Sequence, residues 1–498
     1  MLLNNKSPYR RNFIISVLLT ALFLFLQREN YWRPYIYTGQ DSIGSAYAHG
    51  CAIANELGLK KNPFMIHDID FVNHQLHEYT HWPNGHFFFL FLFIKIFGNT
   101  ELTGRSYAVM LNLFAAFLLA FAFRDKKGFV FYSMPFLLLT PIARDSIPYV
   151  FIEPSFHFWI GFTAFSVSFS EAPEKRKLSA VLFRIACITA PFFAHLILPF
   201  LLFGAVTRYL FHKDKKALAA DIALIAAAFA AMFLALAWTE KGLSYGLKDL
   251  FLHFLHRSNL SIRFHEEAPV SMVMLADTII YKLKHNLLVF WYLLPLAWLY
   301  CLLKRKSVSF LLPAAAVNIL LMSNYVYPHV FAQYNFIWLS LVTAFFLASY
   351  LLEHLSDAGA AFFHAEKNQG GQKENTIITA AVLTTVFIFS CYEVRTNSTS
   401  YQIDPVFVNF HNTFTSLKNE IEHSECNCFD RISVQNGQLV KYEGRTISLY
   451  AQFFLAEKVL RSIKRNEPKQ CGGINFEEHT LLCHENGLQS LPAENFTP

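Results

Sequence analysis

The chain has 498 residues, of which 54% are hydrophobic and only 16% are charged. Soluble domains carry about 25% charged residues, so this composition excludes an ordinary soluble protein and predicts a multi-pass membrane protein. The formal net charge of +6 does not predict nucleic-acid binding. The basic residues form short clusters between apolar segments, as the orientation of a membrane protein requires.

The apolar segments predict an all-α membrane domain with about eleven transmembrane helices, because a helix needs about 20 apolar residues to cross the hydrocarbon layer. No small-residue cleavage site follows the first segment, so we interpret it as a retained span and not as a signal peptide. The predicted spans are 13–27, 106–123, 128–143, 149–170, 178–194, 195–211, 217–238, 287–303, 308–323, 332–352 and 376–391.

Clusters of lysine and arginine predict the orientation of these spans. They gather in every second connection, which the positive-inside rule assigns to the cytoplasm. The amino terminus is therefore expected inside and the carboxyl terminus outside. The segment between Lys177 and Arg208 is long for one span and short for two. Since both of its ends are basic, we predict a hairpin of two helices that turns near His195.

The loop between the first two spans, about residues 28–104, is larger than a simple connection requires. Residues 47–58 have helical spacing and end at a glycine, which is a common helix stop. The apolar segment 87–97 is too short to cross the membrane, so we expect it to lie in the interface as a helix. A polar turn, 79–86, separates these two predicted helices.

The tail, 392–498, is polar and predicts a small α/β domain outside the membrane, with helices at 407–421 and 450–463 and a strand at 431–434. Four of the eight cysteines lie in this tail, which suits an oxidising compartment and predicts two disulfides. The alternatives are reduced thiols or a zinc site that includes a tail histidine. These cysteines are Cys426, Cys428, Cys471 and Cys483.

Histidines in the first outer loop suggest a second kind of site. His77 and His81 are four residues apart, and on a helix they would share one face and form a zinc or manganese pair. Alternatively, loop histidines hydrogen-bond to backbone groups or to acceptor sugars. The sequence establishes no cofactor and leaves a divalent metal ion as an open alternative.

The order and spacing of these features resemble the GT-C glycosyltransferases, particularly the bacterial relatives of protein O-mannosyltransferases and aminoarabinose transferases. That family has an acid early in the first outer loop, a helix ending in Leu-x-Gly (here Leu-Gly, without the intervening residue), a His/Pro-rich turn, an aromatic interfacial helix, an arginine opening the second span, and an acid at the head of the fourth span. The resemblance covers about residues 10–170, and the rest of the chain is similar in topology only. The matching positions are Asp41, Leu57-Gly58, His81-Trp82-Pro83, Phe87 to Gly98, Arg105 and Glu153, with Asp145 shortly before the last.

Three departures from the family pattern affect the expected site. Asp41 is followed by Ser42, where the family often has a glutamate. The second acid is Glu153 and not aspartate. A late Arg-Tyr pair is replaced by Gln333-Tyr334, which puts in doubt the usual contact with the lipid phosphate at that position.

The resemblance implies transfer of a sugar from a polyprenyl-phosphate donor to a glycan, lipid or protein acceptor outside the membrane, in a bacterial inner membrane. Asp41 is the expected base that accepts the acceptor's proton, and Glu153 is the second expected catalytic acid. An inverting reaction needs only one such base. The alternative role for Glu153 is a structural pairing with Arg144 or Arg105. The residues expected to bind substrates in this region and near the late spans are Asp145, His81, Arg105 and Tyr334.

The outer loop from Glu240 to Asn286 is basic, against the positive-inside tendency, and its segment 247–256 is amphipathic. This segment is expected to lie at the interface and to present Lys248 or Arg257 to a lipid phosphate. The alternative is ordinary contact with lipid headgroups.

Two other function classes fit parts of this sequence. A transporter or flippase of lipid-linked saccharides would explain the spans, but transporters commonly show internal repeats and interrupted helices, and we find no repeat. An O-antigen ligase or polymerase would more usually place its large outer loop late in the membrane domain. We therefore predict a glycosyltransferase, with a transmembrane catalytic domain at 1–391 and a carboxyl-terminal domain at 392–498.

Overall fold

The structure is a computed structural model of the 498-residue chain. It describes residues 8–32, 43–59, 66–70, 75–79, 82–123, 129–138, 140, 146–239, 241–257, 271–287, 295, 298–299 and 301–323, together with short pieces of the tail at 412–413, 415–417, 419–420, 423–424, 426, 428–433, 458–467, 471–475 and 480–483. The predicted spans 332–352 and 376–391 and most of 287–303 lie outside these residues.

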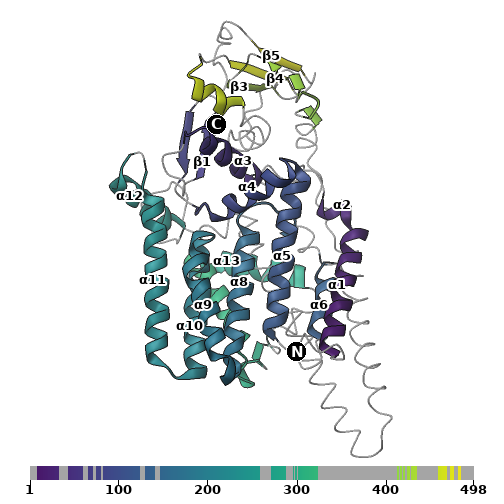
Figure 1. The fold of residues 1–498 in the computed structure, drawn as a ribbon, viewed down its shortest axis with the longest axis vertical. Coiled ribbons are helices and arrows are strands. Elements are labelled where there is room, and N and C mark those ends of the chain that lie inside the picture. Colours follow the sequence, from purple (N-terminus) through teal and green to yellow (C-terminus); the bar gives the residue numbers. More distant parts are fainter. Residues whose placement is uncertain are drawn as a thin grey trace, which may run out of the picture.

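The membrane domain is a bundle of helices that run up and down between two ends (Figure 1). By length and composition, four helical segments of the described chain can cross a membrane: 9–26, 101–123, 195–212 and 215–237. The chain is therefore a multi-pass membrane protein, as predicted. The principal helices are α1 (Pro8–Leu26), α5 (Glu101–Phe123), α8 (Glu153–Ser168), α9 (Arg176–Thr189), α10 (Leu198–His212) and α11 (Lys215–Ala237).

Shorter elements occupy the remaining predicted spans. The segment predicted at 128–143 contains a 3-10 turn, η1 (Phe129–Tyr132), followed by α6 (Ser133–Leu137). The segment predicted at 308–323 contains η6 (Ser307–Phe310) and α15 (Leu311–Leu321). The predicted hairpin is present, since α9 and α10 are separate helices joined through η4 (Ala190–Phe192) and η5 (His195–Ile197).

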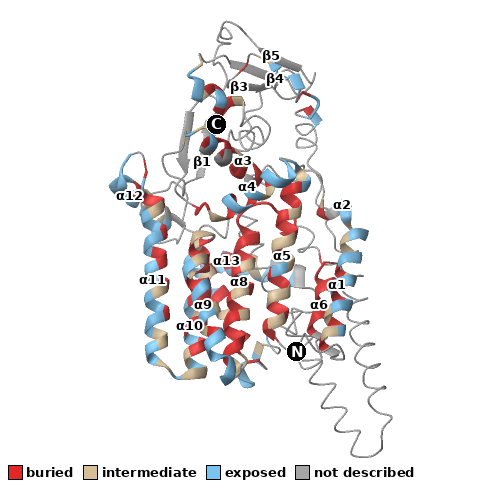
Figure 2. Cartoon of the chain, viewed as in Figure 1, coloured by how far each residue is buried: buried red, intermediate tan, exposed pale blue. Residues whose placement is uncertain are grey.

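Close packing of small residues holds the centre of the bundle together. Helices α5 and α8 approach so closely that a Cβ atom on Gly161 would lie 2.6 Å from the carbonyl oxygen of Ala115. Small residues permit such approach between membrane helices, where dispersion contacts and hydrogen bonds drive association. The outer faces of α9, α10 and α11 instead expose large apolar side chains such as Val181 and Phe233, which suits contact with lipid (Figure 2).

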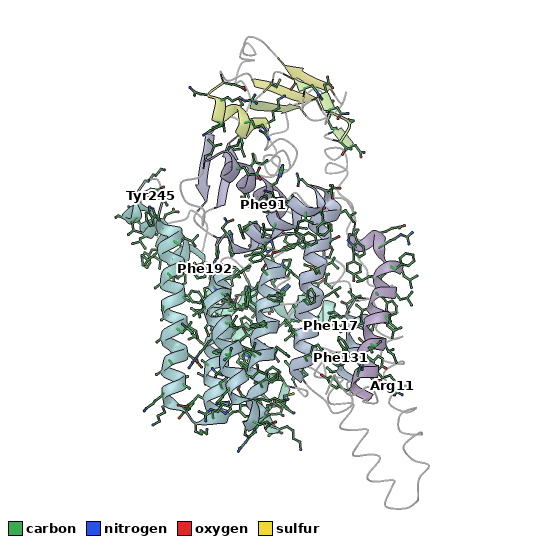
Figure 3. The ribbon with its side chains drawn as sticks, viewed as in Figure 1. Arg11, Phe91, Phe117, Phe131, Phe192 and Tyr245 are labelled. Atoms are coloured by element: carbon green, nitrogen blue, oxygen red, sulfur yellow. The ribbon has the colours of Figure 1, made fainter. Side chains whose placement is uncertain are left out.

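Aromatic rings join α1 to its neighbours. The ring of Phe13 lies 5.8 Å from Phe117 on α5 and 5.1 Å from Phe131 in η1, and Phe121 lies 4.9 Å from Phe131. Figure 3 labels Phe117 and Phe131 beside α1. Edge-to-face pairs of this kind add to the stabilisation that burial provides. The many phenylalanines of the sequence are thus partly accounted for by packing within the bundle.

One end of the bundle carries the elements of the first outer loop (Figure 1). These are α2 (Arg28–Tyr31), α3 (Ile43–Glu56), the antiparallel pair β1 (Ile66–Asp70) and β2 (Gln75–Tyr79), and α4 (Gly85–Phe97). The predicted helix at 47–58 and interfacial helix at 87–97 correspond to α3 and α4, and Gly58 and Gly98 follow them with φ angles of 65° and 89°. We call this end of the molecule the loop end.

Helix α12 (Leu243–Arg257) and the tail strands also lie toward the loop end, whereas α13 (Met272–Leu287) lies at the level of the bundle (Figure 1). Helix α12 follows α11 and includes the segment predicted to be amphipathic, and α13 comes after it. In the tail, β3 (Cys428–Ser433) pairs parallel with β4 (Cys471–Asn475), which pairs antiparallel with β5 (Thr480–Cys483). Cys426 is disulfide-bonded, whereas Cys187 and Cys301 in the membrane domain are free thiols.

The opposite end of the bundle is basic, and we call it the basic end. It contains the connections around Lys175–Lys177, Lys213–Lys216 and Lys304–Lys306. Polar contacts fasten these connections. Asp214 caps α11 by accepting a hydrogen bond from the backbone N–H of Ala217 at 3.0 Å, a common way to satisfy a helix amino terminus. Glu171 accepts from the N–H and hydroxyl of Ser307, both at 2.8 Å.

Candidate active site

The loop end brings together the two chain segments that carry the predicted catalytic acids. The backbone N–H of Gly44, at the start of α3, donates to the carbonyl of Val150 at 2.9 Å. Gly44 comes three residues after Asp41, and Val150 three residues before Glu153. A Cβ atom at position 44 would lie 2.1 Å from the Val150 oxygen, so only glycine permits this approach. Asp41 itself lies outside the described residues.

Side chains of α5 hold the loop that leads into Glu153. Arg105 donates from Nη1 to the carbonyl of Pro148 at 2.8 Å, and Asn112 donates from Nδ2 to the carbonyl of Ile147 at 2.9 Å. Arg105 is fully buried. Buried carbonyls require such partners. Arg105 was predicted to bind substrate. The contact that the structure shows is with the backbone of the loop before Glu153, which it holds in position.

Glu153 is the first residue of α8 and is 2% exposed. Pro154 follows it, and proline is favoured in the first turn of a helix, where its missing N–H is not needed. The positive end of the helix dipole stabilises a carboxylate at this position. The structure therefore places the second predicted acid at the loop end, buried and adjacent to the segment that contacts α3.

A hydrogen bond between His86 and Ser155 joins α4 to the first turn of α8. The two side chains meet at 2.7 Å between Nδ1 and Oγ, and both are buried. The hydroxyl of Tyr107 also donates to the carbonyl of His86 at 3.4 Å. Burial lowers the pKa of His86 to about 3, so the imidazole is neutral at physiological pH. It is then available for hydrogen bonding and not for an ion pair.

A second polar contact lies deeper between α5 and α8. Asn112 Oδ1 and His157 Nδ1 are 2.7 Å apart, and both residues are fully buried. Sequence analysis gave no role to these two residues, nor to the pair of His86 and Ser155. The available signal was the presence of polar residues inside apolar segments, which marks a functional or packing site in a membrane protein.

Aromatic side chains connect the turn between α9 and α10 to the same region. The rings of Trp82 and His195 are stacked with centroids 4.6 Å apart, and Trp82 contacts Phe151 edge-on at 5.9 Å. A Cβ atom on Gly85 would lie 2.5 Å from the carbonyl oxygen of Phe192. The start of α4 is therefore wedged between the start of α8 and the α9–α10 turn.

For the other predicted site residues, the structure gives either the secondary-structure element alone or no description. Lys248 and Arg257 belong to α12, of which Arg257 is the last residue. His77 lies in β2, where its Cα pairs with that of Asp68. The predicted helix that would give His77 and His81 a shared face is therefore wrong at His77, because this residue belongs to a strand that ends at Tyr79. The predicted site residues outside the described chain are Asp41, His81, Asp145 and Tyr334.

A metal ion has no assigned position in this site. Among the residues that the structure describes, no group of three or more His, Cys, Asp or Glu side chains is close enough to hold one.

Comparison with solved structures shows which fold this arrangement represents. The chain aligns with ArnT from Cupriavidus metallidurans bound to undecaprenyl phosphate, with a TM-score of 0.56 and 12% identity, over 91% of this chain and 85% of that chain. The chain has a GT-C fold. Apo ArnT aligns over the same shares with a TM-score of 0.50. An apo oligosaccharyltransferase from Archaeoglobus fulgidus aligns with a TM-score of 0.48 and 10% identity, over 90% of this chain and 61% of that one.

The GT-C likeness rests on structure and not on sequence. No protein-family model matches the chain, and no curated protein is similar to it at a significant level. The GT-C fold agrees with the order of elements described above: a first span, a large loop with α3 and the short apolar helix α4, and then the paired helices α5 and α8. The predicted resemblance is thus confirmed at the level of the fold.

Proposed function

We propose that the chain is a glycosyltransferase that moves a hexose or pentose from a polyprenyl-phosphate-linked donor to an acceptor outside the membrane. The acceptor is a glycan, a lipid or a protein. The fold shared with ArnT, which was crystallised with undecaprenyl phosphate, supports the class of donor. The alternative, a transporter or flippase of lipid-linked saccharides, finds no specific support in the described residues.

The contact between Gly44 and Val150 carries this proposal. It joins segments 106 residues apart in the sequence, each three residues from an acid that the sequence analysis selected. Arg105 and Asn112 fasten the same loop from α5. Several independent hydrogen bonds therefore organise the region around Glu153, as a site that must hold reacting groups in fixed geometry requires.

The proposed reaction inverts the configuration of the transferred sugar. Asp41 accepts the proton of the acceptor hydroxyl, whose oxygen then attacks the anomeric carbon. The bond from that carbon to the phosphate oxygen breaks, and the electron pair leaves with the polyprenyl phosphate. Because phosphate is a good leaving group, no strong acid is needed to protonate it. Glu153, fixed at the start of α8, orients the acceptor or the sugar.

Cationic side chains of the outer loops are proposed to hold the donor phosphate. Lys248 lies on α12, whose residues Leu247, Phe251 and Phe254 are exposed apolar groups. Such a helix binds at a membrane interface, where its cations meet lipid phosphates. Arg257, at the end of the helix, and Tyr334 are proposed to contribute to the same phosphate site.

The proposed topology places the site outside the cytoplasm, in a bacterial inner membrane. The basic end faces the cytoplasm, the amino terminus lies inside, and eleven spans place the carboxyl terminus outside. The disulfide at Cys426 supports this placement of the tail, since disulfides persist in oxidising compartments. We propose that residues 392–498 form a separate α/β domain beside the transmembrane domain 1–391.

The proposal is tested by comparing lipid-linked sugars and glycan products by mass spectrometry in cells with and without the chain. The purified protein is then assayed in vesicles with a polyprenyl-phosphate sugar. We expect a product that carries the sugar and disappears when the protein is omitted. If no transfer is seen and lipid-linked sugar instead accumulates on one leaflet without the protein, the chain is a transporter.

A further inference from the structure

A cluster of charged side chains lies between α9, α10 and α11 near the basic end. Asp221 on α11 accepts hydrogen bonds from Arg208 on α10 and from Arg184 on α9, the latter at 3.4 Å from Nε. The side chains of Asp221 and Arg208 are 2% and 4% exposed. Arg208 also donates to Ser179 at 3.3 Å and lies over the ring of Phe183. One carboxylate is thus shared between two guanidinium groups.

The environment of Arg184 differs from that of Arg208. Its side chain is 47% exposed, and its hydrogen bond to Asp221 is made by Nε, so neither Nη atom takes part in that bond. Arg184 lies on the apolar outer face of α9, because Val181, three residues before it, and Ile188, four residues after it, are 57% and 48% exposed. This face of the helix is exposed (Figure 2) and apolar, which suits contact with lipid.

The charges at this point do not balance. Arg208 neutralises Asp221 in the buried pair, which leaves the positive charge of Arg184 uncompensated. The neighbouring pair of Arg176 and Asp214 at the start of α9 and α11 is neutral in itself. An uncompensated guanidinium that faces hydrocarbon is costly, so such groups take an anionic partner.

The position of Arg184 along α9 bears on which layer of the membrane its side chain can reach. Arg184 comes eight residues after Arg176, the first residue of α9, which is about 12 Å along the helix. The basic residues before it lie in water or among headgroups, so a long side chain at this depth reaches the headgroup boundary. Its planar fork of Nη donors fits two oxygens of a phosphate.

We propose that Arg184, held by Asp221, binds the phosphate of an anionic phospholipid from the leaflet at the basic end. The acyl chains lie along Val181 and Ile188, and the phosphate accepts hydrogen bonds from the Nη atoms, which the bond to Asp221 leaves unused. A membrane lipid is favoured over a free phosphate ion because the exposed surface on both sides of Arg184 is apolar. This site is separate from the candidate active site and does not depend on the proposed function.

The test measures lipid binding to the purified full chain by native mass spectrometry in detergent. Phosphatidylglycerol should bind the unmodified chain about tenfold more tightly than Arg184→Gln, as expected for loss of a charge-assisted, bidentate contact. Phosphatidylcholine should bind more weakly than phosphatidylglycerol, and diacylglycerol, which lacks phosphate, should not bind the site. Inorganic phosphate in millimolar excess should not displace the lipid.

Lys177→Gln is the matched control, because it removes the same charge from the same helix, two turns closer to the basic end. It should change binding less than about twofold. Equal losses in both variants, or no loss in Arg184→Gln, would overturn the proposal, and displacement by inorganic phosphate would replace it with a small-anion site. If Arg184→Gln is destabilised, which a lower unfolding temperature without lipid would show, Arg184→Lys replaces it as the test variant. Lysine keeps the positive charge but lacks the planar fork of donors. That variant should lose about threefold in affinity, and an unchanged affinity would contradict the bidentate contact.

Discussion

Gly44 and Val150 are in direct backbone contact, with 2.9 Å between the amide nitrogen of one and the carbonyl oxygen of the other. This contact fixes the start of α3 against the loop that precedes Glu153. It therefore sets the separation between the segments that carry the two proposed acids.

Gly44→Ala tests this relationship. The added Cβ would lie 2.1 Å from the Val150 oxygen, so the backbone must move, and we expect transfer to fall about tenfold or more because misplacement by about 1 Å can cost a hundredfold in rate. The measurement is the rate of glycosyl transfer at saturating donor. Gly98→Ala is the control, since nothing lies within 4 Å of its Cβ position. That variant loses about 1 kcal/mol of stability through its positive φ, with activity retained. Full activity in Gly44→Ala would show that the contact does not position the acids.

Asp41→Asn tests the proposed base. It keeps the size and polarity of the side chain but removes the basic oxygen, so transfer should fall by at least about a hundredfold while donor-lipid binding persists. Glu153→Gln should have a smaller effect, and Asp145→Asn shows whether a different acid in that region matters. Glu56→Gln is the matched control on α3, because its exposed pairing with Lys95 at 3.2 Å contributes little. A rate within a few-fold of the unmodified enzyme for Asp41→Asn would exclude it as the base.

Burial of neutral His86 predicts a pH dependence of stability. Its folded-state pKa is about 3, below the ordinary value of 6.5, so the unfolded chain binds the proton more readily. The contribution of this group is complete above about pH 6.5 and declines as pH falls toward 3, by up to about 1.4 kcal/mol per pH unit. Thermal unfolding in detergent between pH 7.5 and 4.5 measures the decline.

His86→Asn should make that decline shallower, because asparagine does not titrate but still offers an oxygen to Ser155. His86→Leu should also make it shallower, with an additional loss of stability at every pH because the Ser155 hydroxyl is left buried without this partner. Identical pH profiles for the unmodified chain and His86→Asn would show that His86 is protonated or hydrated in the folded protein.

Reporter fusions test the proposed topology. A reporter fused after Pro498 should be active only outside the cytoplasm, and one fused at Gln369 only inside, because the proposed topology has eleven spans, the last of them after Gln369. The measurement compares a reporter that is active outside with one that is active inside at each position. Cytoplasmic activity at the carboxyl terminus would mean that a span is miscounted.

The sequence alone determined those features that depend on local composition. The membrane-crossing helices α5 and α11, the short apolar helix α4 and the end of α3 near Gly58 all follow from helical spacing, apolar length and helix-stopping residues. Each of these signals lies within about 25 consecutive residues. The alternation of basic and non-basic connections likewise predicted the reversal between α9 and α10.

Only the tertiary structure decided which distant residues meet. His77 is in a strand because residues 66–70 pair with 75–79, and strand formation depends on a partner more than on intrinsic propensity. Arg105 contacts the carbonyl of Pro148, and His86 contacts Ser155, across 43 and 69 residues of sequence. These bonds form because a buried polar group must find a partner in the folded chain, and no local pattern shows which partner that is.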